Sequence, residues 1–165
     1  MQKIHLVCGQ PGAGKTTFAR ALAEDTKGIH LLMDECMKPL SFPDLQDVSF
    51  MKCVVEPKAL KCAASLLEKA TYHLSQGQDV VLDLATFEKR HRDSVRQWAR
   101  AIDTELILYW VRANQLTRRK RVLERNNGRG SSYSFQVPNW VFDYMEAKFE
   151  APTEAESAIL VDRDG

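Results

Sequence analysis

Short apolar runs alternate with amphipathic stretches along most of this chain. The runs are rich in Val, Ile and Leu, as buried strands are, and they predict strands over residues 4–8, 29–33, 80–84, 105–111 and 158–161. Between them, apolar side chains recur at helical spacing, which predicts helices over residues 15–25, 57–76, 88–101, 114–126 and 139–149. This alternation predicts an α/β fold with a parallel sheet that helices cover on both faces.

The boundaries of the second predicted helix are marked by proline and glycine. Pro57 suits a first helical turn because it needs no amide donor there, and Gly77 suits the position just past a helix end. The preceding stretch, residues 36–55, contains prolines and the apolar residues Phe42 and Phe50. We expect it to be irregular and to line a pocket for a substrate.

The composition is that of an ordinary globular protein. The 165 residues suit a single domain spanning residues 1–165, and 44% of them are hydrophobic. The formal net charge is +1, so the charge of the whole molecule favours neither nucleic acid nor an anionic membrane. No apolar run approaches the roughly 18 residues that a membrane helix needs, and no signal-peptide pattern opens the chain. We therefore expect a cytoplasmic protein with no membrane partner.

The cysteines form no recognisable metal or redox motif. They are Cys8, Cys36, Cys53 and Cys62. No two of them form a Cys-x-x-Cys pair, and no histidine cluster lies at zinc spacing. The pattern predicts free thiols in a reducing compartment, with Cys8 a small buried residue of the first strand.

The turn between the first strand and the first helix matches the phosphate-loop pattern G-x-x-x-x-G-K-[ST]. Its residues are Gly9, Gln10, Pro11, Gly12, Ala13, Gly14, Lys15 and Thr16. The glycines permit a loop whose N–H groups turn inward around phosphate oxygens, and the helix N-terminus adds partial positive charge. We expect Lys15 to bridge the β- and γ-phosphates of ATP and Thr16 to bind Mg²⁺ through its hydroxyl. Thr17 is placed to reach the α-phosphate.

A carboxylate ends the third predicted strand, where residues 80–83 read Val-Val-Leu-Asp. Ligands of parallel sheets bind outside the carboxyl ends of the strands, so Asp83 is placed to hold Mg²⁺ together with Thr16. The alternative is that Asp83 caps the next helix. The following residue is Leu rather than Glu, which argues against a dedicated ATP hydrolase.

Asp34 follows the second predicted strand. If that strand lies beside the first, the carboxylate faces the γ-phosphate and can accept the proton of an attacking hydroxyl. The alternative is that Asp34 caps the following turn. Glu35 is a weaker candidate, because it points the other way from the strand.

Basic residues dominate the segment from residue 112 to residue 129. They are Arg112, Arg118, Arg119, Lys120, Arg121, Arg125 and Arg129, against the single acid Glu124. Arg118, Arg121 and Arg125 recur at helical spacing and share one face. Arginines stabilise the charge that develops in phosphoryl transfer, so the segment 114–137 is a candidate lid. The alternatives are a solvated basic face and a grip on nucleic acid.

Together these motifs resemble the small P-loop kinases of the zeta-toxin, chloramphenicol phosphotransferase and polynucleotide kinase group. The resemblance rests on the phosphate loop, Leu31-Leu32-Met33-Asp34, Val81-Leu82-Asp83-Leu84-Ala85-Thr86-Phe87, Arg121-x-x-x-Arg125-Asn126 and Phe149-Glu150-Ala151-Pro152. It implies a three-layer P-loop NTPase fold with a parallel five-stranded sheet and a helical lid. It also implies that Asp34 is the catalytic base and that Arg121 and Arg125 are lid arginines. Relatives often read Asp-Ala-Thr after the third strand, whereas Leu84 intervenes here.

The leading hypothesis is a phosphotransferase that moves the γ-phosphate of Mg-ATP to a hydroxyl of a small molecule or of a nucleic acid end. Lys15, Asp34, Arg121 and Arg125 are its candidate catalytic residues. One alternative is an ATP-gated regulator whose output is a partner interaction, although the Asn-Lys-x-Asp element of GTPases is missing. Another is a toxin-like kinase of a metabolite.

Overall fold

The computed structural model describes residues 1–37, 47–128 and 137–164. Its strands are β1 (Lys3–Cys8), β2 (Ile29–Leu32), β3 (Val80–Asp83), β4 (Glu105–Arg112) and β5 (Ile159–Asp162). Its longer helices are α1 (Lys15–Thr26), α4 (Glu56–Ser75), α5 (Lys89–Ala101), α6 (Gln115–Asn126) and α7 (Asn139–Lys148). Shorter helical segments are α2 (Met33–Met37), α3 (Val48–Phe50), the π-helix η2 (Met51–Val55) and the 3₁₀-helix η3 (Glu154–Glu156). The predicted elements are confirmed to within a few residues, because each has its own hydrophobic period.

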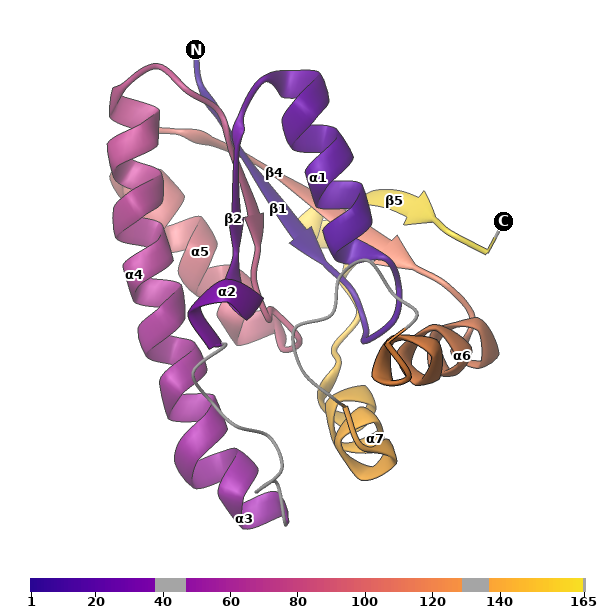
Figure 1. Cartoon of the computed structure of the whole chain (residues 1–165). Coiled ribbons are helices and arrows are strands. Elements are labelled where there is room, and N and C mark those ends of the chain that lie inside the picture. Colours follow the sequence, from indigo (N-terminus) through magenta and orange to yellow (C-terminus); the bar gives the residue numbers. More distant parts are fainter. Residues whose placement is uncertain (38–46, 129–136, 165) are drawn as a thin grey trace.

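The strands form one parallel sheet in the order β2-β3-β1-β4-β5 (Figure 1). β1 lies in the centre, so the loop that follows it emerges between the ends of β3 and β4. β2 pairs with β3 and not with β1, and the supposition that the second strand lies beside the first is therefore wrong. A parallel connection can pass over a neighbouring strand, which sequence order alone does not reveal.

Helices cover both faces of the sheet, as predicted (Figure 1). α1 packs on one face, where its residues Ala19 and Ala23 meet Val7 and Val81 of the central strands. On the other face, residues of α4 and α5 join a larger core that includes residues of every strand except β5. Side chains of a strand alternate between these two cores, so the residue that ends each strand has a defined side. The result is the three-layer arrangement of P-loop NTPases.

The segment before α4 is more regular than predicted. Residues 48–55 are helical and run directly into α4, and Phe50 packs against the larger core instead of being exposed. Phe42 lies outside the described residues. The prediction of an irregular stretch over 36–55 was therefore wrong for its second half, because Met51 and Val55 continue the buried face of α4.

A disulfide joins Cys36 of α2 to Cys62 of α4, with 5.9 Å between their Cα atoms. The prediction of free thiols was wrong for these two, because α2 and α4 pack together although 26 residues separate the cysteines in sequence. Cys8 and Cys53 are free, the first buried and the second exposed. Burial raises the pKa of the Cys8 thiol to about 11, so it is an inert core residue as expected. Among the described residues no helix is both long and apolar enough to cross a membrane.

Candidate functional site

The phosphate loop connects β1 to α1, as its sequence predicts. Gly12 and Gly14 adopt left-handed backbone angles, with φ of 76° and 93°. A Cβ on Gly12 would lie 2.4 Å from the carbonyl oxygen of Arg118, and one on Gly9 would lie 2.1 Å from that of Val111. The glycines are therefore required both for the turn and for close packing against β4 and α6. No side chain caps the N-terminus of α1, which leaves its first amides available for phosphate oxygens.

Lys15 opens α1 and folds back over the loop. Its Nζ donates to the carbonyl oxygen of Gln10 at 3.0 Å and lies 5.8 Å from the centre of the Phe87 ring. Burial lowers the pKa of Lys15, while the charges of Asp83 and Asp34 act in the opposite direction. The ammonium group is thus near both carboxylates that sequence analysis selected. It is held in a place where an anionic ligand would strengthen its charged form.

Thr16 and Asp83 are brought together although 67 residues separate them. The Thr16 hydroxyl donates to Oδ2 of Asp83 at 2.7 Å, and Asp83 is only 4% exposed. A hydroxyl and a carboxylate are hard oxygen ligands of the kind that Mg²⁺ takes when nucleotide phosphates and water complete its shell. No group of three or more His, Cys, Asp or Glu suited to a metal occurs among the described residues. The pair therefore fits a nucleotide-bound Mg²⁺ and not a metal caged by protein alone.

The loop after β3 retains this geometry despite the extra residue. Leu84 is buried in the larger core, and Asp83 still reaches Thr16. The Thr86 amide donates to the Leu84 carbonyl at 2.9 Å, which closes a tight turn. The hydroxyl of Thr86 is buried without a hydrogen-bond partner among the described residues. With Leu84 in place, the Asp83 carboxylate therefore still reaches Thr16.

Asp34 lies in the first turn of the short helix α2 and is half-buried. Burial lowers the pKa of Lys15 and that of Arg125, and the negative charge of Asp34 acts in the opposite direction on both. Asp34 therefore lies within electrostatic range of Lys15, although β3 lies between the strands that precede the two residues. Glu35, the weaker candidate, is exposed.

The arginines of α6 divide into two groups. Arg118 is 3% exposed and fully engaged, because Nε donates to the Ala113 carbonyl and both Nη atoms donate to Glu146 of α7. Glu146 also accepts from Gln10 of the phosphate loop at 2.8 Å. Arg118 shares a helix face with the candidate lid arginines, but it serves as a structural tie among the phosphate loop, α6 and α7.

Among the described residues, Arg121 and Arg125 make no ion pair with a carboxylate. Arg121 donates to the backbone carbonyls of Gly12, at 3.5 Å, and of Arg163, at 2.8 Å. Burial lowers the pKa of Arg125, whose Nε is buried without a hydrogen-bond partner among the described residues. An arginine with an unpaired buried nitrogen is suited to bind an anion.

In the candidate lid, residues 114–137, the start of α6 contacts the phosphate loop, and the end of α6 is joined to Val137. Gly12 packs directly on the backbone of α6, and Asn126 pairs with the backbone N–H and C=O of Val137 at 2.9 and 2.8 Å. Residues 129–136 lie outside the described residues. Leu116 and Leu123 are exposed on the opposite side of α6 from the arginines. The N-terminal part of α6 is thus fixed to the phosphate loop.

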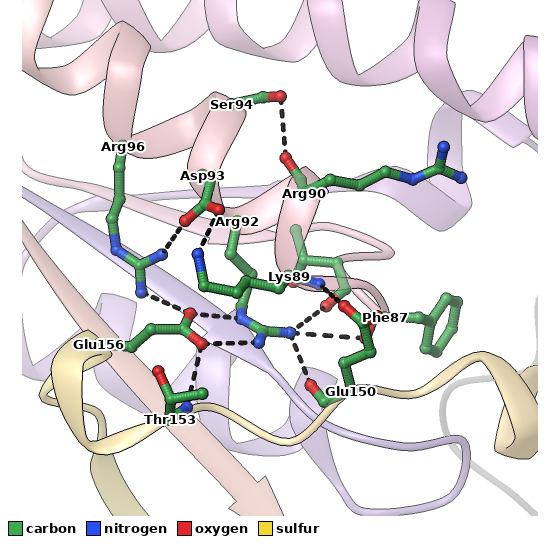
Figure 2. Close-up of polar contacts among 11 residues, drawn as sticks. Phe87, Lys89, Arg90, Arg92, Asp93, Ser94, Arg96, Glu150, Thr153 and Glu156 are labelled. Atoms are coloured by element: carbon green, nitrogen blue, oxygen red, sulfur yellow. Dashed lines mark hydrogen bonds and ion pairs between the residues drawn. The ribbon is translucent and has the colours of Figure 1, made fainter.

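Sequence analysis missed one residue that supports the site, a buried arginine that contacts the loop after β3 (Figure 2). Arg92 of α5 is fully buried and makes a bidentate ion pair with Glu156, at 2.8 and 2.9 Å. It also donates to the carbonyl of Glu150 at 2.8 Å and, more weakly, to those of Thr86 and Phe87. The network fixes the loop that follows Asp83. The sequence did contain a sign of this burial, because Arg92 lies at helical spacing from the buried residues Val95 and Ala99.

The fold and the phosphate loop define the class of the protein: it is a P-loop nucleotide-binding protein. A family model described as an AAA domain matches residues 4–152, and the chain belongs to that family. A search of curated proteins finds no significant match.

Solved structures share the fold at low sequence identity. A sugar kinase from Janibacter sp. HTCC2649 has a TM-score of 0.69 and 18% identity, covering 98% of this chain and 86% of that one. A gluconokinase from Sinorhizobium meliloti 1021 has a TM-score of 0.62 and 17% identity, covering 98% and 82%. Kti12 from Chaetomium thermophilum, in complex with ADP-AlF3, has a TM-score of 0.68 and 18% identity, covering 98% and 88%. At such identities the likeness extends to the fold alone.

Proposed function

We propose that this protein is an ATP-dependent phosphotransferase that moves the γ-phosphate of Mg-ATP to a hydroxyl group. The observation that carries the proposal is the contact between Thr16 and Asp83, at 2.7 Å, beside Lys15. A magnesium ion bound there would neutralise phosphate charge and orient the transferred group. The phosphate-loop amides and Lys15 would hold the β- and γ-phosphates, and Thr17, exposed at the first turn of α1, is free to reach the α-phosphate.

Asp34 is the proposed general base. A carboxylate near Lys15 can accept the proton of the acceptor hydroxyl as its oxygen attacks the γ-phosphorus and the bond to the β-phosphate oxygen breaks. The electrostatic interaction of Asp34 with both Lys15 and Arg125 supports this role.

Arg125 is the proposed clamp on the transferred phosphoryl group. Its unpaired buried Nε can donate to an equatorial oxygen, where charge increases in the transition state. Arg121 and Arg163 lie beside Gly14, at the edge of the phosphate loop. We propose that Arg121 steadies that edge against the bound nucleotide.

A small-molecule acceptor is favoured over a nucleic acid end. A grip on nucleic acid needs free cations along α6, but Arg118 and Arg119 are paired with Glu146 and Asp143. Arg112 is likewise paired, with Asp162. Two structural neighbours, a sugar kinase and a gluconokinase, suggest hydroxyl-bearing sugars and sugar acids as the first acceptors to assay.

The test separates nucleotide binding from transfer. Wild type and Asp34→Asn are incubated with γ-labelled ATP, Mg²⁺ and a panel of sugars, sugar acids and 5′-hydroxyl oligonucleotides, and products are resolved by mass spectrometry. We expect Asp34→Asn to bind ATP with nearly unchanged affinity in calorimetry while losing transfer. Glu35→Gln is the matched control and should keep transfer, because Glu35 is exposed.

Two results would contradict the proposal. Unchanged transfer in Asp34→Asn removes Asp34 from the base role. An ATP-dependent conformational change without a phosphorylated product from any acceptor would favour the alternative, a nucleotide-gated regulator.

A further inference from the structure

The ring of His30 leaves one polar atom unexplained. His30 lies in β2 opposite Val81 of β3, on the sheet face that α1 covers. Its Nε2 is buried and has no hydrogen-bond partner among the described residues. Buried polar atoms are nearly always hydrogen-bonded, so such an atom calls for a physical reason.

The nearest charged group to this nitrogen belongs to the proposed metal site. Nε2 of His30 is 3.7 Å from Oδ2 of Asp83, the same oxygen that accepts the hydrogen bond of Thr16. A hydrogen bond from a ring N–H requires about 3.2 Å or less, so the present contact is close to a hydrogen bond but is not one. The side chains of His30 and Asp83 are 17% and 4% exposed, which leaves water little access to the pair.

We propose that His30 is a positioning residue for Asp83. In this proposal, which rests on the proposed function, the ring donates its Nε2 proton to the Asp83 carboxylate and fixes the orientation of that carboxylate when Mg-nucleotide binds. Groups that hydrogen-bond to a metal ligand orient it, and their loss typically weakens metal affinity about 10–100-fold. The contrasting possibility is that the ring only fills space between α1 and the sheet.

The experiment measures metal binding without turnover. Mn²⁺ replaces Mg²⁺ and is titrated by electron paramagnetic resonance against the protein saturated with a non-hydrolysable ATP analogue. We expect His30→Leu, which removes the donor, to weaken Mn²⁺ binding about 10–100-fold. His30→Gln should restore most of the affinity, because a glutamine amide reaches as far as Nε2, whereas the shorter His30→Asn should not.

Two controls separate positioning from packing. Affinity for the analogue in the presence of a chelator should be unchanged in all three variants, because the phosphate loop is intact. His73→Leu, in α4 and bonded to Gln78, should leave Mn²⁺ affinity at the wild-type value.

The outcomes distinguish this inference from the function on which it rests. If wild type binds Mn²⁺ with the analogue and His30→Leu binds it equally well, His30 has no positioning role. Equal loss in His30→Gln and His30→Asn would likewise indicate packing. If wild type binds neither Mn²⁺ nor the analogue, the proposed function itself fails.

Discussion

The two carboxylates beside the phosphate loop are held in different ways. Asp83 ends β3, is bonded to Thr16, and is followed by a loop that the Arg92 network fixes from behind. Asp34 lies on α2, a helix of 5 residues, which is secured by buried Met33 and Met37 and by a disulfide to α4.

The proposed metal ligand, Asp83, and the proposed general base, Asp34, therefore depend on different supporting contacts. The metal ligand depends on an ion-pair network, whereas the position of the base depends in part on a covalent tether that a reductant can open. Asp83 and the loop that follows it should therefore remain fixed when α2, which carries Asp34, loosens.

Removing the arginine behind Asp83 should have the largest effect on stability. Arg92→Met leaves Glu156 buried with Arg96 as its remaining cationic partner. We expect the free energy of unfolding to fall by about 3–5 kcal/mol, because the buried Glu156 loses its bidentate partner and its charge is then only partly compensated. Urea denaturation followed by circular dichroism measures the change.

Arg90→Met is the matched control for that variant. Arg90 lies on the same helix but is exposed and paired with Glu88, so its loss should lower the free energy of unfolding far less than the loss of Arg92, because exposed ion pairs contribute little. Equal small losses in the two variants would show that the Arg92 network does not hold the loop.

Opening the disulfide should have the next largest effect on stability. The local loosening that it causes should be confined to α2, which carries Asp34. The Cys36–Cys62 bond spans 26 residues, and breaking a crosslink of this kind typically costs 2–4 kcal/mol. Reduction with dithiothreitol should lower the free energy of unfolding of wild type by that amount and leave Cys36→Ser unaffected.

Hydrogen exchange then locates the effect of reduction. Amides of α2 should exchange faster after reduction, while amides of residues 84–88 should not. Cys53→Ser, which removes an exposed free thiol, should respond to reductant as wild type does. Faster exchange both in α2 and in residues 84–88 would show that the two carboxylates are not held independently.

Acid should weaken the ion pair between Arg92 and Glu156, with a smaller effect on the free energy of unfolding than the two changes above. Hydrogen bonds from Arg92 lead the causes that lower the pKa of Glu156 from 4.5 to about 2, and those from Arg96 contribute. A depressed pKa stabilises the fold above the unfolded-state value of 4.5, and this contribution is lost as the pH falls from 4.5 towards 2. By pH ~3 we expect a loss of about 2 kcal/mol.

The measurement is the difference in unfolding free energy between wild type and Glu156→Gln at neutral and acid pH. The difference should shrink as the pH falls, because wild type loses the stabilisation that the variant never had. Glu154→Gln, an exposed neighbour in the same 3₁₀-helix, should show no such pH dependence. A constant difference for Glu156→Gln would mean that the carboxylate is not stabilised in its charged form.

Local chemistry determined the phosphate loop and most element boundaries. The loop pattern from Gly9 to Thr16 can be recognised in the sequence because its residues are contiguous, and the positive φ angles of Gly12 and Gly14 belong to the turn itself. Strand and helix periods are likewise local, so the fold class followed from them. Asp83 and Asp34 were identifiable because parallel strands present their ends at one edge of the sheet.

The tertiary structure decided which partners these residues have. The order of β2 and β3, the pairing of Cys36 with Cys62, and the engagement of Arg118 by Glu146 all join residues far apart in the sequence. An arginine that pairs with a carboxylate and one whose buried Nε has no partner among the described residues look alike in sequence, as Arg118 and Arg125 do on one face of α6. Only the fold distinguishes them, because burial and long-range contacts determine whether a charge is already neutralised.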